Sequence, residues 1–189
     1  MKITKLFEGL KRIENGDYVI KGDLTATESI EIDLDDRLVV RGKVETKKSI
    51  IANQTLIVRC GIEAGCGIKA GWGIEAGDGI KAGWGIKAGC GIKAGDGIEA
   101  GCGIEAGGGI EAGVGIEAGW GIKAGDGIEA GCGIKAGCGI EAKTYISTQK
   151  RIFAGIHLFH SSAECYKEIK CKELRCGEIA YGDLVISHE

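Results

Sequence analysis

The sequence lacks proline altogether and has only three histidines, one methionine and 5% aromatic residues. The absence of proline excludes a collagen-like chain in spite of the 35 glycines, because collagen needs proline and a period of three. No run of eighteen apolar residues occurs, so no transmembrane helix is expected. Charged residues scattered through the first twenty positions leave no room for a signal peptide, and the chain is expected to be cytoplasmic.

Charge and cysteine content narrow the possible partners further. The net charge of −3 is too small to indicate binding to nucleic acid or to an anionic membrane. The nine cysteines are an odd number in a chain without an export signal, which favours reduced thiols over disulfides. We therefore expect these cysteines to act as small, weakly polar packing residues.

The dominant feature is a hexad, Gly-Ile-(Glu or Lys)-Ala-Gly-X, that repeats from Gly61 to Ala142. Such self-similarity is typical of solenoids. Aliphatic residues continue at every sixth place beyond the perfect hexads: Ile20, Ala26, Ile32, Leu38, Val44, Ile50 and Leu56 before them, and Ile146, Ile152 and Leu158 after them. Residues two places later, such as Leu34, Val40 and Val58, are also apolar or small in most cases.

An apolar pair separated by one charged residue has the period of a β-strand, with Ile and Ala pointing inward and Glu or Lys outward. A helix is excluded because each hexad carries two or three glycines, each costing a helix about 1 kcal/mol. Gly-X-Gly supplies the bend, since glycine adopts positive φ and permits close backbone approach. The sequence thus predicts an all-β, single-stranded β-helix in which one hexad forms one side of a coil.

The outward charges favour three sides per coil. Residues one coil apart lie about 4.8 Å from each other, where like charges are destabilising. With about 18 residues per coil, 8 of 11 stacked Glu/Lys pairs have opposite signs, more than with twelve or twenty-four. The same spacing stacks Cys66, Trp84, Cys102, Trp120 and Cys138 in one column, with each indole between small thiols. A triangular solenoid is predicted.

The two ends differ from this shaft. Ile3, Leu6, Phe7, Leu10 and Ile13 have helical spacing and precede Asn15-Gly16, so residues 1–16 are predicted to form an N-terminal amphipathic capping α-helix. The hexad-repeat β-solenoid is assigned to residues 17–160. Residues 161–189 are predicted to be an irregular C-terminal coil whose short strands have a period of five: Ile169/Cys171, Leu174/Cys176, Ile179/Tyr181 and Leu184/Ile186.

Residues 18–65 place an aliphatic residue first and a small residue two places later, as in Val44-Glu-Thr46, Ile50-Ile-Ala52 and Ile62-Glu-Ala64. In this respect the stretch VIKGDLTATESIEIDLDDRLVVRGKVETKKSIIANQTLIVRCGIEAG resembles the bactofilins, bacterial polymer-forming cytoskeletal proteins. The resemblance implies a right-handed triangular β-helix that joins end to end into non-polar filaments without nucleotide. Hexapeptide acyltransferases fit less well, because their small inward residue would fall here on Asp78, Asp96, Trp72 or Trp84.

No arrangement of reactive residues predicts catalysis, a metal or a cofactor. His157 and His160 are three residues apart on an extended strand and face opposite sides, and the third histidine is His188. Cys165, Cys171 and Cys176 have only a vague zinc-like spacing, and core packing is the better interpretation of Cys171 and Cys176. Asp78 and Asp96 stack in Gly-Asp-Gly corners, but Cys60 and Val114 border them, which favours a solvated corner over a calcium site.

Trp72, Trp84 and Trp120 are the candidate interaction residues. If the X positions point outward, these indoles form exposed apolar surface that favours a partner or self-association; if inward, they fill the core. We therefore expect a structural or assembly protein, a non-enzymatic rod that self-associates or scaffolds. The alternative is a binding module presenting flat faces to a polysaccharide, ice or a phage or host surface. A remoter alternative, a hexapeptide-type acyltransferase, would need His157 as its catalytic group.

Overall fold

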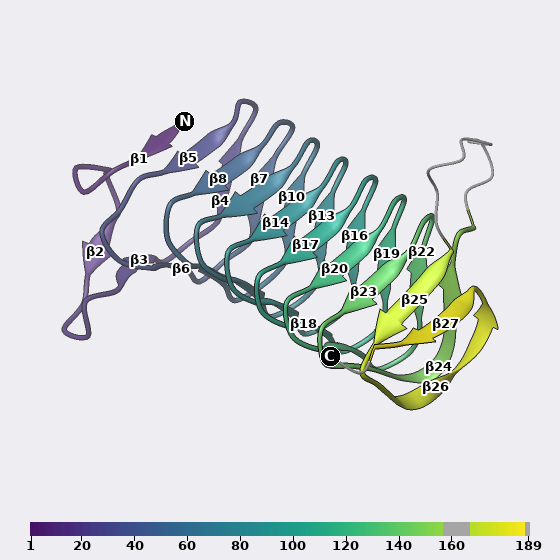
Figure 1. The fold of residues 1–189 in the computed structure, drawn as a ribbon. Helices are drawn as coiled ribbons and strands as arrows, with labels where there is room; N and C mark the ends of the chain where they lie inside the picture. Colours follow the sequence, from purple (N-terminus) through teal and green to yellow (C-terminus); the bar gives the residue numbers. More distant parts are fainter. Residues whose placement is uncertain (157–166, 188–189) are drawn as a thin grey trace.

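The computed structural model describes residues 1–156 and 167–187, and it forms a single-stranded β-solenoid of about nine turns (Figure 1). The coils follow one another along a straight axis, with the N-terminus at one end and the last strands at the other. Within the described residues the secondary structure consists of strands alone. The prediction of an all-β solenoid is therefore confirmed.

Most strands have three residues, and each coil contributes one strand to each of three faces. Face 1 contains β5 (Ile30–Ile32), β8 (Ile50–Ala52), β11 (Ile68–Ala70), β14 (Ile86–Ala88), β17 (Ile104–Ala106), β20 (Ile122–Ala124) and β23 (Ile140–Ala142). Face 2 contains β4 (Leu24–Ala26), β7 (Val44–Thr46), β10 (Ile62–Ala64), β13 (Ile80–Ala82), β16 (Ile98–Ala100), β19 (Ile116–Ala118) and β22 (Ile134–Ala136). Face 3 contains β3 (Tyr18–Ile20), β6 (Leu38–Val40), β9 (Leu56–Val58), β12 (Ile74–Ala76), β15 (Ile92–Ala94), β18 (Ile110–Ala112) and β21 (Ile128–Ala130).

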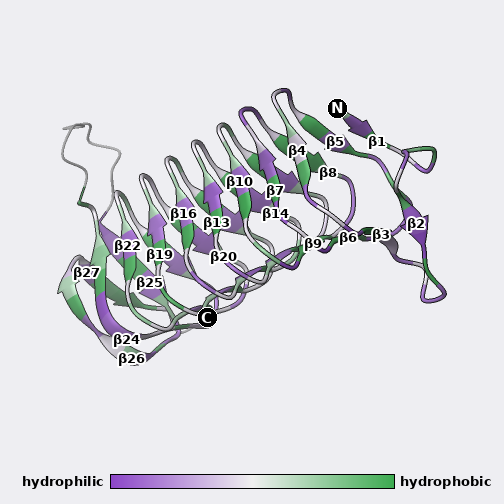
Figure 2. Ribbon diagram, turned by 180° about the vertical axis from the view of Figure 1, so that it is seen from behind, coloured by the Kyte–Doolittle hydropathy of each residue, from purple (hydrophilic) through white to green (hydrophobic). Residues whose placement is uncertain are grey.

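The strands of each face run parallel, and along the hexads each residue pairs with the residue eighteen positions later. Ile62, for example, lies opposite Ile80, and Ala64 lies opposite Ala82. The predicted coil of about 18 residues is thus confirmed for the shaft. Isoleucine and alanine side chains of every hexad strand are buried, while the Glu or Lys between them faces solvent. Figure 2 shows this alternation of hydrophobic and hydrophilic residues along the strands.

Glycine is needed in the corners for close packing and not for its positive φ. Between Gly61 and Gly139 no glycine has a positive φ, so that part of the expectation is wrong. A Cβ atom added to the first glycine of a corner, such as Gly83 or Gly95, would overlap a carbonyl oxygen of the preceding coil. Along the perfect hexads the corners of successive coils are stacked so closely that the backbone leaves no room for a Cβ atom at this position.

The first coil is two residues longer than those of the shaft. Tyr18 pairs with Leu38 and Ile30 with Ile50, twenty residues apart. The inward pairs of this coil therefore begin at Tyr18, Leu24 and Ile30, two places before the predicted Ile20, Ala26 and Ile32. The extra residues lie in the corner after β5, where Leu34 is buried and its backbone N–H and C=O both bond to the side chain of Asn53.

The predicted N-terminal capping helix is wrong, because the segment forms two short strands joined by turns. β1 (Lys2–Ile3) adds to β5 at the edge of face 1, and β2 (Lys11–Arg12) pairs antiparallel with β3. Gly9 adopts a positive φ in the middle of the predicted helix, which is incompatible with a continuous helix over this segment. Leu6 is 95% exposed, whereas Phe7 and Leu10 pack against the core. The segment covers the first coil without being helical.

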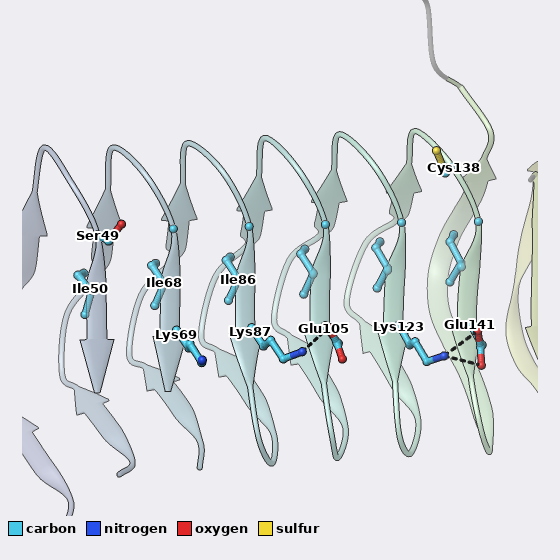
Figure 3. Close-up of a pocket in the computed structure, with 18 of the residues that line it drawn as sticks. Ser49, Ile50, Ile68, Lys69, Ile86, Lys87, Glu105, Lys123, Cys138 and Glu141 are labelled. Carbon is cyan, nitrogen blue, oxygen red and sulfur yellow. Dashed lines mark hydrogen bonds and ion pairs between the residues drawn. The ribbon is translucent and has the colours of Figure 1, made fainter. Parts of the chain in front are cut away.

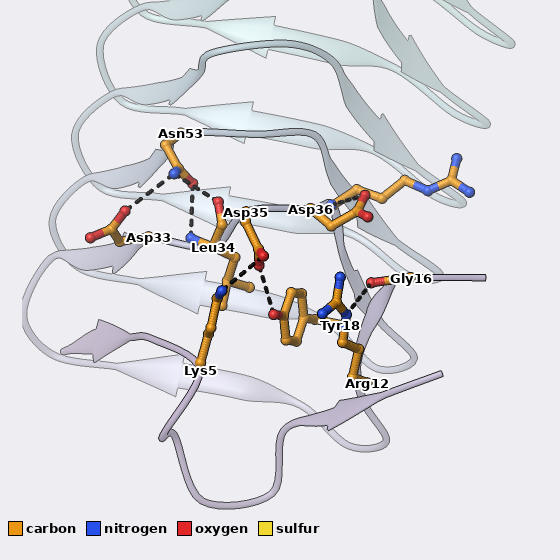
Figure 4. Close-up of polar contacts among 10 residues, drawn as sticks. Lys5, Arg12, Gly16, Tyr18, Asp33, Leu34, Asp35, Asp36 and Asn53 are labelled. Carbon is orange, nitrogen blue, oxygen red and sulfur yellow. Dashed lines mark hydrogen bonds and ion pairs between the residues drawn. The ribbon is translucent and has the colours of Figure 1, made fainter. Parts of the chain in front are cut away.

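A polar cluster fastens this segment to the first coil (Figure 4). Lys5 Nζ donates a hydrogen bond of 2.8 Å to Asp35, and the Tyr18 hydroxyl donates one of 2.7 Å to the same carboxylate. These two bonds hold the pKa of Asp35 well below its ordinary value of 3.8. Nearby, Arg37 donates to the buried carboxylate of Asp17 and lowers its pKa as well. Both carboxylates are thus held in their ionised form.

We expect acid to loosen the N-terminal segment before the shaft. A carboxyl group whose folded-state pKa is lowered stabilises the fold above its unfolded-state pKa, and this contribution is lost as the pH falls through the folded value. Amide protection in β1 and β2, corrected for intrinsic exchange rates, should fall between about pH 4 and about pH 2. Asp35→Asn should loosen the same amides already at neutral pH, whereas Asp126→Asn in the shaft should not. Equal acid sensitivity in all coils would contradict this interpretation.

The C-terminal part of the solenoid contains longer strands than the shaft. β24 (Tyr145–Ala154) runs through faces 3 and 2 without a glycine corner, because Gln149, Lys150 and Arg151 replace the Gly-X-Gly turn. β25 (Glu168–Cys171) and β27 (Asp183–Ile186) extend face 1, and β26 (Glu173–Tyr181) lies along β24. The predicted strands are present, although Leu174/Cys176 and Ile179/Tyr181 share one nine-residue strand. The irregular stretch predicted around His160 lies outside the described residues for the most part.

Candidate functional site

Each corner of the coil aligns with the corners above and below it, so the X residues form three straight edges. The backbone N–H of each X residue donates to the carbonyl of the X residue one coil earlier, as in Trp84 to Cys66 and Cys102 to Trp84. We name the edge between faces 2 and 1 the tryptophan edge; it carries Cys66, Trp84, Cys102, Trp120 and Cys138. It runs along the row of turns at the top of Figure 1.

The three indoles point outward. Trp72, Trp84 and Trp120 are 58%, 65% and 53% exposed, which decides between the two orientations that the sequence left open. Trp84 and Trp120 lie on the tryptophan edge, two coils or about 9.6 Å apart. Trp72 lies on the edge between faces 1 and 3, above Cys90, Gly108 and Asp126. All three indoles therefore border face 1.

The faces themselves carry a ladder of charges. Lys and Glu side chains one coil apart form ion pairs between Lys81 and Glu99, Lys87 and Glu105, Lys93 and Glu111, Lys123 and Glu141, and Lys135 and Glu117. The side chains are about half exposed, so each pair stabilises the fold by less than about 1 kcal/mol. Their main effect is to neutralise each face within the chain, which leaves little net charge to select a partner.

Beside each charged row runs a shallow groove along the axis, floored by the glycines that precede the isoleucines. On face 1 the groove has a volume of about 700 Å³ and passes Gly67, Gly85, Gly103 and Gly121. Figure 3 shows the Lys87–Glu105 and Lys123–Glu141 pairs that flank it. A similar groove of about 770 Å³ follows face 2. These grooves are long and open, unlike the enclosed pockets that hold small substrates.

The C-terminal end exposes the continuation of the core. Leu184 stacks on Ile169 and Ile186 on Cys171, so both occupy positions that are buried in every hexad coil. Here they are 42% and 37% exposed, and Tyr181 is 49% exposed. The strands here were predicted from the apolar pairs, but their exposure was not: no later coil of the described chain covers them.

The cysteines differ from one another more than the sequence indicated. Cys171 is buried in the core as predicted, and burial raises the pKa of its thiol. Cys176 was also predicted to be a core residue, but it is exposed because the irregular register of β26 turns it outward. Cys138 is disulfide-bonded, so the expectation of reduced thiols throughout is wrong for this residue. The other seven described cysteines are free.

The remaining candidate groups do not come together. Within residues 1–156 and 167–187 no group of three or more His, Cys, Asp and Glu side chains could hold a metal ion. Asp78 and Asp96 stack at one edge through backbone hydrogen bonds, with Cys60 and Val114 next to them. Four of the candidate residues lie outside the described residues: His157, His160, Cys165 and His188. The structure therefore does not test the catalytic role considered for His157.

Comparison of the chain with protein-family models, curated proteins and solved structures gives no match. Among the described residues, no helix is long and apolar enough to cross a membrane. The surfaces of the solenoid itself are therefore the basis for assigning a function: an apolar C-terminal end, an edge with two indoles, and the glycine-floored grooves along the faces.

Proposed function

We propose that this chain is a structural assembly protein, a rigid β-solenoid rod whose copies join through their C-terminal ends. The observation that carries the proposal is the exposure of Leu184 and Ile186 at positions that belong to the core. A solenoid whose last coil is uncovered exposes apolar side chains and unpaired strand edges, which favour association with another chain. We retain the resemblance to bactofilins as part of this proposal, with the right-handed winding that it implies.

The partner that fits this end best is the same end of a second copy. The N-terminal end is already covered, because Ile3 is buried there and Phe7 and Leu10 pack against the core. Charged side chains near the C-terminal end pair within the chain, as Lys167 does with Asp183 and Arg151 with Glu178. Two identical apolar ends can therefore meet across a two-fold axis without opposing unpaired charges.

The test introduces a charge at the end of the core. Ile186→Asp should weaken association at least tenfold in sedimentation velocity, because a carboxylate would be buried without a partner in the joint. Val185→Asp is the matched control: Val185 is the outward residue of the same strand, stacked on Lys170, and is exposed to the same degree. Monomeric wild-type protein at about 100 μM, or equal behaviour of the two variants, would refute the proposal.

We also propose that the chain is not an enzyme, since the reactive side chains of the described residues are dispersed along the rod and its grooves are open. One observation favours a second function. The groove on face 1 lies next to the tryptophan edge, since Gly85 and Gly121 in its floor directly follow the exposed Trp84 and Trp120, an arrangement suited to an extended polysaccharide. A glycan array probed with the wild-type chain and with Trp84→Ala would separate this function from assembly alone.

A further inference from the structure

The tryptophan edge differs from the other two edges in its charge. Its corners from Gly65 to Gly139 contain only glycine, cysteine and tryptophan. The edge between faces 3 and 2 carries Asp78 and Asp96, and the edge between faces 1 and 3 carries Asp126. The centres of protein interfaces are depleted of charged residues and enriched in aromatic ones, so only the tryptophan edge has the composition of an interface.

The indoles on this edge point toward solvent, and Trp84 is the more exposed of the two. Each lies between two glycines, so no side chain within the corner covers it. Exposed tryptophans of this kind contribute strongly to association, because burying an indole removes a large apolar area from water at little cost in side-chain entropy. Trp84, at 65% exposed, lies at the middle of the shaft.

The order of side chains along the edge is self-complementary. Indole and thiol alternate from coil to coil as Cys66, Trp84, Cys102 and Trp120. When a second copy runs in the opposite direction about a two-fold axis midway between Trp84 and Cys102, every indole of one copy faces a small thiol of the other. A parallel copy in register would oppose indole to indole, and a parallel copy shifted by one coil would not form a closed dimer.

We propose that the tryptophan edge is a lateral interface between two antiparallel copies of this chain, with Trp84 packed against Cys102 of the second copy. Charges beside the centre of this interface do not oppose it. Lys87 pairs with Glu105 on face 1, and Lys81 pairs with Glu99 on face 2, both within one chain. The interface uses surface separate from the C-terminal end and extends the proposed function from end-to-end joining to side-by-side pairing.

The test adds a carboxylate to the edge by Trp84→Asp. Aspartate is compatible with this corner, because Gly-Asp-Gly occurs at Asp78, Asp96 and Asp126 of the same shaft. Trp72→Asp makes the identical change on a different edge and is the matched control. Both changes are made in full-length protein that also carries Ile186→Asp, so that the end contact is already weakened.

In sedimentation velocity the Ile186→Asp protein should still form dimers. Trp84→Asp should weaken these dimers about thirtyfold, and Trp72→Asp should leave them within about twofold. Equal effects of the two tryptophan changes, or a purely monomeric Ile186→Asp protein, would overturn the lateral interface. If instead Ile186→Asp alone has no effect and Trp84→Asp abolishes association, the lateral interface holds and the end contact fails.

The antiparallel order has its own readout. Trp84→Cys should form a disulfide with Cys102 of the second copy when an added oxidant accepts the two electrons and two protons of the thiols. Because residue 84 also lies one coil from Cys66 and Cys102 of its own chain, the covalent dimer is first isolated under non-reducing conditions, and mass spectrometry of its cross-linked peptides then identifies the pair. A bond between two introduced thiols, or no bond to Cys102, would contradict the register, and Trp72→Cys is the control for random oxidation.

Discussion

Gly95→Ala should unfold the solenoid at a much lower urea concentration than the wild-type chain does. A Cβ atom at residue 95 would overlap the carbonyl oxygen of Gly77 in the preceding coil, and this oxygen is part of the backbone. The corner can accept the methyl group only if two coils move apart, which breaks their hydrogen bonds on both sides. We expect a loss of roughly 3 kcal/mol in the free energy of unfolding, measured by urea titration followed with circular dichroism.

The second glycine of the same corner provides the control. A Cβ atom at Gly97 would lie 3.3 Å from the carbonyl oxygen of Gly115, a tight but tolerable contact. Removing a glycine also lowers the entropy of the unfolded chain, which opposes the effect of the contact. Gly97→Ala should therefore change the stability by less than about 1 kcal/mol. Similar losses for both variants would mean that the corners are not stacked as described.

Ile104→Ala in the middle of the shaft should cost about 2–5 kcal/mol. Ile104 is 1% exposed and stacks between Ile86 and Ile122. Deleting its side chain therefore leaves a cavity between these two isoleucines in the core. Because each coil contacts only its neighbours, the loss should be local. Hydrogen exchange should increase most in β14, β17 and β20 and should leave the first coil unchanged.

Val114→Ala is the corresponding control at a corner. Val114 is 48% exposed and lies in the corner directly after β18, so shortening it removes little buried area. The change in stability should stay within about 0.5 kcal/mol. If Val114→Ala proved as costly as Ile104→Ala, the assignment of inward and outward positions would be wrong.

The shaft could be predicted from the sequence because the apolar pattern and the glycine positions of each hexad indicate the same structure. Ile62, Glu63 and Ala64 alternate in burial as a strand does, and Gly61 and Gly65 mark where the chain must turn. The coil length then followed from residues that would stack on one another. A spacing of eighteen residues brings together opposite charges and places Trp84 next to Cys102, as the structure has them. Agreement between independent local signals is what makes such a fold predictable.

Several features of the two ends were predicted wrongly, because the local sequence pattern there indicates a different structure from the one that tertiary contacts stabilise. Ile3, Phe7 and Leu10 have helical spacing, but the free edge of β5 offers hydrogen bonds to β1, and Gly9 turns the chain. The two-residue insertion after β5 preserves the alternation of apolar residues, so its register could not be distinguished from that of Ile32 and Leu34. At the other end, spacing alone placed Cys176 inside, and only the bulges in β26 turn it outward.

The candidate surfaces were predictable to different degrees. Periodicity identifies Trp84 and Trp120 as one column but says nothing about which way a corner residue points. The structure supplies this orientation because Gly83 and Gly85 hold the backbone against neighbouring coils and leave only the outside for the indole. For Leu184 and Ile186, the alternation of apolar residues is the same as in the buried pair Ile169 and Cys171, so the local pattern does not show that they are exposed.

Electron microscopy of the unmodified, full-length protein tests the central claim most directly. A coil stack of about nine turns at about 4.8 Å per turn should be about 43 Å long. If copies join through their C-terminal ends, most particles should be rods of about twice this length or more, with two-fold symmetry about the joint. A uniform population of single rods of about 43 Å, unchanged as the protein is concentrated, would contradict the assembly function.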